Sequence, residues 1–138
     1  MTATKKQRKL LRAYVRWVAD SMELRDWSIT LVYDPPADDN CLAHVKCVYG
    51  RKIATITFPR DFFDCSPERQ RHAITHELVH LHFSGLEWQY NNLSDRVAPD
   101  VFHAIWGGLQ DQLEFAVDAM ASAVAKHLPM PKQAKGSA

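Results

Sequence analysis

A five-residue motif in the middle of the chain, His76-Glu77-Leu78-Val79-His80, requires a helix if its two histidines are to act together. Side chains four residues apart in an α-helix lie one turn above each other on the same face, so both imidazoles can reach one point. Ser66 is typical of an N-cap and Pro67 of a first helical position. We therefore predict a helix that begins at residue 67 and ends near residue 84, before Gly85.

The motif matches the pattern H-E-x-x-H, in which two histidines bind a divalent metal ion and the glutamate acts on a metal-bound water. In a chain of this composition, a chance match is expected at about the one in a hundred level. The alternative is a helix whose His76 and His80 are ordinary core or surface histidines. The two interpretations differ in whether the chain supplies a third metal ligand, as a catalytic zinc site requires.

Two acidic residues, Glu114 and Asp118, are the best candidates to complete such a site. They lie four residues apart in an almost wholly apolar stretch, residues 113–121, so we expect them in a buried helix without a basic partner. A metal ion bound by Glu114 would neutralise that buried charge, and Asp118 would accept the N–H of a liganding histidine. The alternative is that both carboxylates lie at the rim of an amphipathic helix and face water.

Taken together, His76-Glu77-x-x-His80 and Glu114-x-x-x-Asp118 resemble the gluzincin group of zinc metallopeptidases, to which thermolysin belongs. A shorter zinc pattern, with a glycine and a third histidine soon after His80, is excluded because Phe83 and Leu86 stand at those positions. The resemblance covers residues 66–128. It is looser to the small ImmA/IrrE-type domains, which have asparagine at the position of Asp118.

The resemblance implies that His76, His80 and Glu114 bind Zn²⁺, that Glu77 is the general base and that Asp118 orients a histidine. The substrate would be a peptide or a protein, and residues 54–58 would form the strand beside the cleft. Gluzincins usually add a histidine or tyrosine that stabilises the oxyanion, and the candidates here are His103, Tyr90 and Tyr49. His103 lies between the two metal-binding segments, where it is alternatively a third zinc ligand or a packing residue.

The remaining sequence pattern predicts an α+β fold of minimal zincin type. We expect an N-terminal helix, a small and mainly antiparallel sheet with a hairpin at Gly50, the motif helix and a C-terminal ligand-bearing helix. The expected ranges are 4–22 for the first helix, 27–33, 43–49 and 52–58 for strands, 86–98 for a loop, and 109–128 for the last helix. A short helix opened by Pro99 would be interrupted at Gly107 and Gly108. The prediction is a single domain over residues 1–128 and a flexible tail over 129–138.

The charge of the chain limits the classes of binding partner that we expect. The 17 basic and 16 acidic residues give a net charge of +1, so no global field indicates nucleic acid. The basic first helix, with Lys5, Lys6 and Lys9, is the exception and would suit an acidic partner.

The odd cysteine number, and a start that resembles neither a signal peptide nor a membrane span, favour a reducing, cytoplasmic location. We expect free cysteines, the alternative being a Cys41–Cys47 disulfide or a metal site with His44.

Two functions are consistent with this pattern. The first is an intracellular zinc metallopeptidase with Glu77 as general base. The second is a catalytically silent, zinc-stabilised zincin scaffold that acts as a protein or nucleic-acid interaction module. Glu77 favours the first hypothesis, because a structural zinc ion has no need of a general base.

Overall fold

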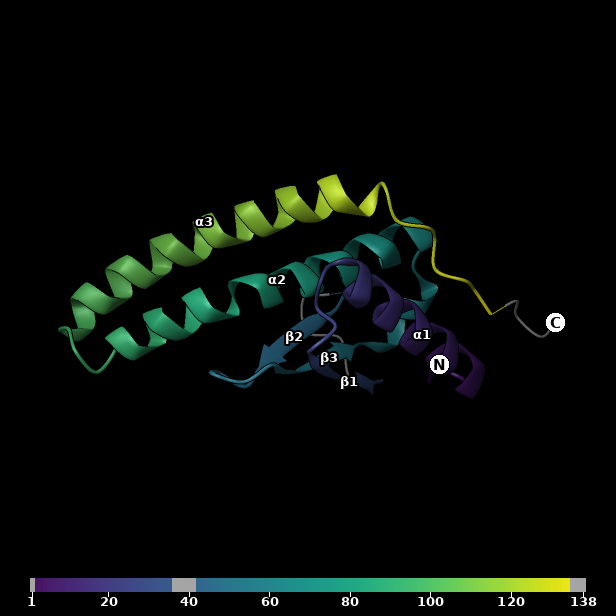
Figure 1. Ribbon diagram of the computed structural model, residues 1–138, viewed down its shortest axis with the longest axis horizontal. Helices are drawn as coiled ribbons and strands as arrows, with labels where there is room; N and C mark the ends of the chain where they lie inside the picture. Colours follow the sequence, from purple (N-terminus) through teal and green to yellow (C-terminus); the bar gives the residue numbers. More distant parts are fainter. Residues whose placement is uncertain (1, 36–41, 135–138) are drawn as a thin grey trace.

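The computed structural model describes residues 2–35 and 42–134 and, within them, contains three α-helices, three strands and one short 3₁₀ helix. The elements are α1 (Lys5–Ser21), β1 (Ser28–Tyr33), β2 (His44–Cys47), β3 (Ile53–Phe58), η1 (Arg60–Asp64), α2 (Pro67–Leu93) and α3 (Pro99–Ala125), as Figure 1 shows. The α+β class is confirmed. The first helix and the three strands lie within their predicted ranges.

The three strands form one sheet in the order β1-β3-β2. β2 and β3 are antiparallel and joined by the predicted hairpin, in which Gly50 adopts a φ of 77° that favours glycine. β1 pairs with β3 in parallel, from Ser28 opposite Ile53 to Tyr33 opposite Phe58. The predicted small sheet is therefore present, but it is mixed rather than mainly antiparallel. An alternating apolar pattern shows that one face of a strand is buried, and parallel and antiparallel pairs both satisfy that pattern.

β3 is the central strand of the sheet, and its buried side chains form part of the hydrophobic core. Its Ala54, Ile56 and Phe58 are buried and pack with residues of α1 and α2, the largest of which are Leu11, Val15, Val18, Ile74, Leu78 and Leu81. Residues 54–58 are thus hydrogen-bonded on both sides and do not form the strand that an added peptide could pair with. The strand at the free edge next to α2 is β2, which corrects the expectation from the family resemblance.

The motif helix α2 begins as predicted, with Ser66 accepting a hydrogen bond from the backbone N–H of Arg69 and Pro67 in the first turn. It does not end near residue 84 but continues through Gly85 to Leu93, and the predicted loop begins only at Ser94. A glycine inside a helix costs about 1 kcal/mol, which packing between helices can offset. Here α3 supplies that packing along α2.

α3 is one uninterrupted helix of 27 residues, so the predicted interruption at Gly107 and Gly108 is wrong. α2 and α3 lie side by side as an antiparallel pair, as Figure 1 shows. Near the turn between them, the ring of Tyr90 packs against Trp106 with 5.9 Å between centroids, and Trp106 stacks on Phe102. The contact between Tyr90 and Trp106 joins the two helices close to these glycines.

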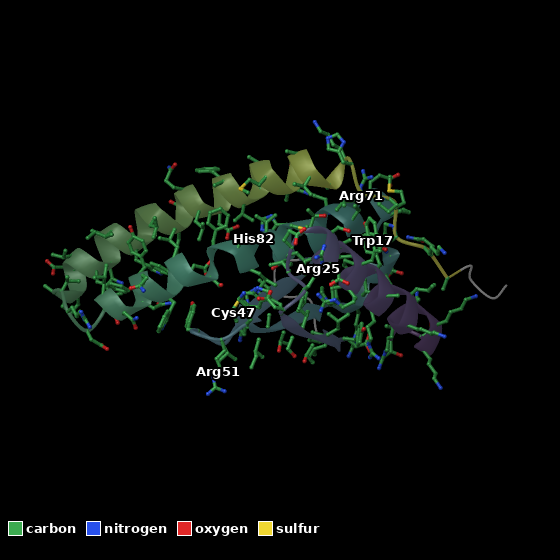
Figure 2. All side chains as sticks on the ribbon, in the orientation of Figure 1. Trp17, Arg25, Cys47, Arg51, Arg71 and His82 are labelled. Atoms are coloured by element: carbon green, nitrogen blue, oxygen red, sulfur yellow. The ribbon has the colours of Figure 1, made fainter. Side chains whose placement is uncertain are left out.

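The end of the described chain returns to α1. Tyr14 Oη donates a hydrogen bond of 2.7 Å to the carbonyl of Pro129, and Arg71 Nη1 donates one of 2.8 Å to the carbonyl of Leu128; Figure 2 shows Arg71 beside this segment. Pro131 is buried. Cys41 and the last four residues of the predicted tail lie outside the described residues. None of the helices in the described part of the chain is long and apolar enough to cross a lipid bilayer.

Candidate metal centre

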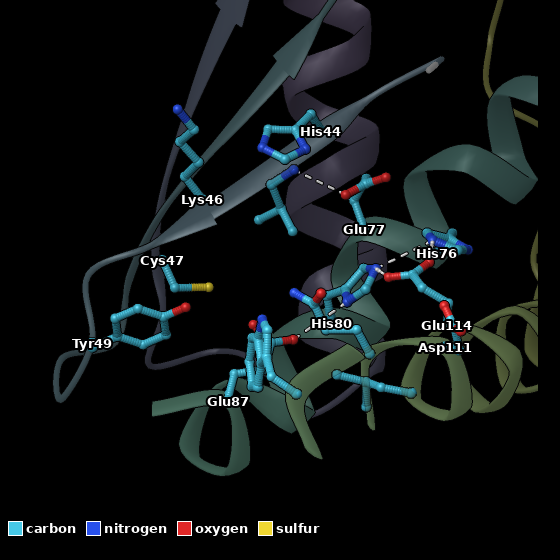
Figure 3. A pocket seen from close by; sticks show the side chains of 14 residues that line it. His44, Lys46, Cys47, Tyr49, His76, Glu77, His80, Glu87, Asp111 and Glu114 are labelled. Carbon is cyan, nitrogen blue, oxygen red and sulfur yellow. Dashed lines mark hydrogen bonds and ion pairs between the residues drawn. The ribbon is translucent and has the colours of Figure 1, made fainter. Parts of the chain in front are cut away.

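Three side chains converge at the middle of the α2–α3 pair: His76 and His80 from α2, and Glu114 from α3. The two Nε2 atoms are 3.2 Å apart, His76 Nε2 lies 3.4 Å from Glu114 Oε2, and His80 Nε2 lies 3.2 Å from Glu114 Oε1. Ligand atoms about 2.0–2.1 Å from a tetrahedral zinc ion are about 3.3–3.4 Å from one another. The spacing of the three donors thus fits the three protein corners of such a site (Figure 3).

The packing between the two helices sets this geometry. The i, i+4 spacing places the imidazoles one above the other on α2, with ring centroids 5.0 Å apart. Val79, within the motif, is buried against Leu113 and Val117 of α3. Because Leu113 directly precedes Glu114, this small apolar cluster fixes the position of α3 at which its carboxylate meets the histidines.

The acidic residues of α3 are not buried as the sequence predicted. The side chains of Glu114 and Asp118 are 56% and 65% exposed. α2 covers only one side of α3, through Leu113, Val117 and Ala121, and the opposite side is open, with Phe115 70% exposed. Some of the apolar residues that flank the two acids in the sequence, such as Phe115, therefore face solvent and not the core. Burial of charge therefore does not explain the position of Glu114, although its carboxylate does lie beside the two histidines.

Carboxylates also lie on the outer side of each histidine. Asp118 Oδ1 is 3.5 Å from His76 Nδ1, the nitrogen turned away from Glu114, and 3.4 Å from Nε2 of His72. Glu87 Oε1 is 3.6 Å from His80 Nδ1. Asp118 was a sequence candidate, whereas Glu87 was missed. Glu87 follows His80 by seven residues, a spacing that places both on one face of a continuous helix. Because the sequence predicted that the helix ends before Gly85, this spacing was not recognised.

Glu77 lies beside the three donors and not among them. Its side chain is buried, and Oε2 accepts a hydrogen bond of 2.9 Å from the backbone N–H of Val45 in β2. Burial raises the pKa of Glu77 to about 7; the nearby His80 and the Val45 N–H lower it, and Glu114 raises it. A carboxyl group with a pKa near neutrality is suited to both accept and return a proton.

The pKa values of the two histidines are shifted in opposite directions. Burial lowers the pKa of His76, and the neighbouring His80 lowers it further, against the raising effect of Glu114 and Asp118. Burial also lowers the pKa of His80, but contact with Glu87 and the charges of Glu114 and Glu77 outweigh it, so the net direction is upward.

A cavity of about 740 Å³ opens beside the three donors, between β2 and the α2–α3 pair (Figure 3). Its walls include His44, Lys46, Cys47 and Tyr49 from β2 and the hairpin, and Glu87, Trp106 and Asp111 from the helices. A second cavity of about 370 Å³, lined by Arg69, His72 and Asp118 among others, shares His76 and Glu77 with the first. His76 and Glu77 therefore lie between the two cavities, and His80 and Glu114 line the larger one.

The other residues considered from the sequence for a role in the site differ in whether they line the larger cavity. His103 lies in α3, 11 residues before Glu114 and hence about 16 Å away along the helix; it contacts Phe102 and does not line either cavity. Tyr49 does line the larger cavity, whereas Tyr90 packs on Trp106. Cys47 is a free thiol whose pKa burial raises to about 11.

Comparison of the chain with protein-family models, with curated proteins and with solved structures finds no match.

Proposed function

We propose that the protein is a zinc-dependent metallopeptidase of gluzincin type. The observation that carries the proposal is the placement of a buried carboxyl, Glu77, directly beside three donors, His76, His80 and Glu114, whose mutual distances of 3.2–3.4 Å suit a tetrahedral ion. Two imidazoles and one carboxylate are ligands that zinc accepts in catalytic sites, with one position left for water. The choice of zinc among divalent metals is part of the proposal.

In this proposal the metal ion and Glu77 have different roles. A bound zinc ion would polarise the peptide carbonyl and lower the pKa of a water molecule. Glu77 would take up the proton of the attacking water and would then deliver it to the amide nitrogen as the C–N bond breaks. The hydrogen bond from Val45 holds Oε2 of Glu77 toward β2, which leaves Oε1 for proton transfer.

The substrate would bind as an extended segment along β2. This strand forms the edge of the sheet, lines the larger cavity, and pairs on its other side with β3. The N–H of Val45 at this edge is bonded to Glu77, so a peptide would pair with the other backbone groups of the β2 edge, which would place a scissile bond over the metal donors. Tyr49 replaces His103 as the preferred candidate for stabilising the oxyanion, because it lies in the cavity wall.

The test compares zinc-loaded wild-type protein with Glu77→Gln on a mixture of dye-quenched peptides, with metal content measured in both. We expect about one zinc ion per chain in each, and a loss of turnover of at least about 10²-fold in the variant, since a general base contributes 10²–10⁴-fold. A zinc-loaded wild-type protein that cleaves no peptide would support the silent-scaffold alternative instead. Equal turnover by the two proteins would exclude Glu77 as the base.

A further inference from the structure

Glu87 lies next to His80, one of the three candidate metal donors. Its Oε1 lies 3.6 Å from Nδ1 of His80, a contact drawn in Figure 3, while Nε2 of the same ring faces Glu114 at 3.2 Å. Within residues 2–35 and 42–134, Glu87 forms no other ion pair. Its side chain is 24% exposed, against 56% for Glu114, so it is the more sheltered of the two carboxylates.

The length of α2 produces this contact. Seven residues correspond to almost two helical turns, so Glu87 projects from the same side of α2 as His80. Had the helix ended at Gly85, Glu87 would lie in a loop. The helix continues instead, and packing at the far end of the α2–α3 pair, between Tyr90 and Trp106, holds this part of α2 in place.

We infer that Glu87 is a positioning residue for His80, an inference that rests on the proposed metal centre. A carboxylate next to Nδ1 keeps the proton on that nitrogen and leaves the lone pair of Nε2 free for a metal ion. It also fixes the rotation of the ring. Asp118, which also lies near His72, stands in the same relation to Nδ1 of His76, so a carboxylate lies beside each of the two histidines, one from α2 and one from α3.

The experiment measures zinc affinity by competition with a chelator of known affinity, and the visible absorption spectrum of the Co²⁺-loaded protein, for four proteins. They are the wild type, Glu87→Ala, Glu87→Gln and Asp111→Asn. Glutamine retains an oxygen that can face Nδ1–H but lacks the charge. Asp111 lines the same cavity and forms no ion pair with a histidine in the described part of the chain, so Asp111→Asn controls for loss of cavity charge.

We expect Glu87→Ala to weaken zinc binding by about 10–100-fold and to change the Co²⁺ spectrum, as loss of a partner to a metal-binding histidine does. Glu87→Gln should lose less, and Asp111→Asn should stay within about twofold of wild type. Equal zinc affinity in wild type and Glu87→Ala, or an equal loss in Asp111→Asn, would overturn the role of Glu87. Absence of metal binding by the wild type would overturn the metal centre itself, whereas absence of peptide cleavage would count against the peptidase alone.

Discussion

Glu77→Gln should change how the stability of the metal-free protein depends on pH. In the folded chain burial raises the pKa of Glu77 to about 7, whereas an ordinary glutamate, as in the unfolded chain, titrates at 4.5. Folding therefore favours the neutral carboxyl: its contribution to stability is fully present below about pH 4.5 and is lost as the pH rises through about 7. The two pKa values differ by an amount equivalent to about 3 kcal/mol of unfolding free energy.

The assay is urea unfolding of wild type and Glu77→Gln at several pH values from 4 to 8.5, in the presence of a chelator. Glutamine can still accept the hydrogen bond from Val45. The measured difference also includes the loss of the Glu77 charge, which raises the pKa of His80 in the wild type. The stability of wild type relative to the variant should fall by about 3 kcal/mol between pH 4 and pH 8. A difference that stays constant over this range would refute the reasoning that burial disfavours the charged form of Glu77.

Three further predictions concern the metal centre, the core and the hairpin. Glu114→Ala removes one of three donors and should weaken zinc binding by more than about 100-fold in chelator competition, because even partners outside the ligand set contribute 10–100-fold; an affinity within threefold of wild type would contradict this. Leu78→Ala, at a fully buried position, should lower the unfolding free energy in urea by about 3 kcal/mol, and a loss below about 1 kcal/mol would be inconsistent with the core described. Gly50→Ala should destabilise by about 1 kcal/mol in thermal melts because its φ is 77°, whereas Arg51→Ala, at the next position, should have little effect.

Local signals in the sequence were sufficient for the start of α2 and for its donors. Ser66 and Pro67 identify a helix start through backbone hydrogen bonding and a fixed φ, both of which act within one turn. The spacing of His76 and His80 needs only helical geometry to bring the imidazoles together. For the same reason the hairpin at Gly50 was predictable, since a tight turn is specified by its own residues.

Features that depend on packing between distant segments were not predictable in this way. Gly85 and the pair Gly107 and Gly108 resemble helix ends locally, but each helix is continued by contact with the other. Because the helix was predicted to end before Gly85, the sequence did not indicate that Glu87 lies on the same face of α2 as His80. Parallel pairing of β1 with β3 was missed because alternation does not encode strand direction.

The position of Glu114 was anticipated from an argument that the structure does not support. The apolar residues around it suggested burial on all sides, yet Phe115 on the adjoining face is 70% exposed. What places Glu114 at the histidines is the contact of Leu113 and Val117 with Val79, a contact between helices that a single sequence does not reveal.

The central claim is that His76, His80 and Glu114 bind one divalent metal ion, and anomalous diffraction at the zinc edge from crystals grown with zinc tests it most directly. The account predicts a single strong peak about 2.0–2.1 Å from Nε2 of both histidines and from a carboxylate oxygen of Glu114. That peak should be absent in crystals of Glu114→Ala grown in the same way. A wild-type crystal with no zinc between these three side chains, or with its zinc held elsewhere, would contradict the account.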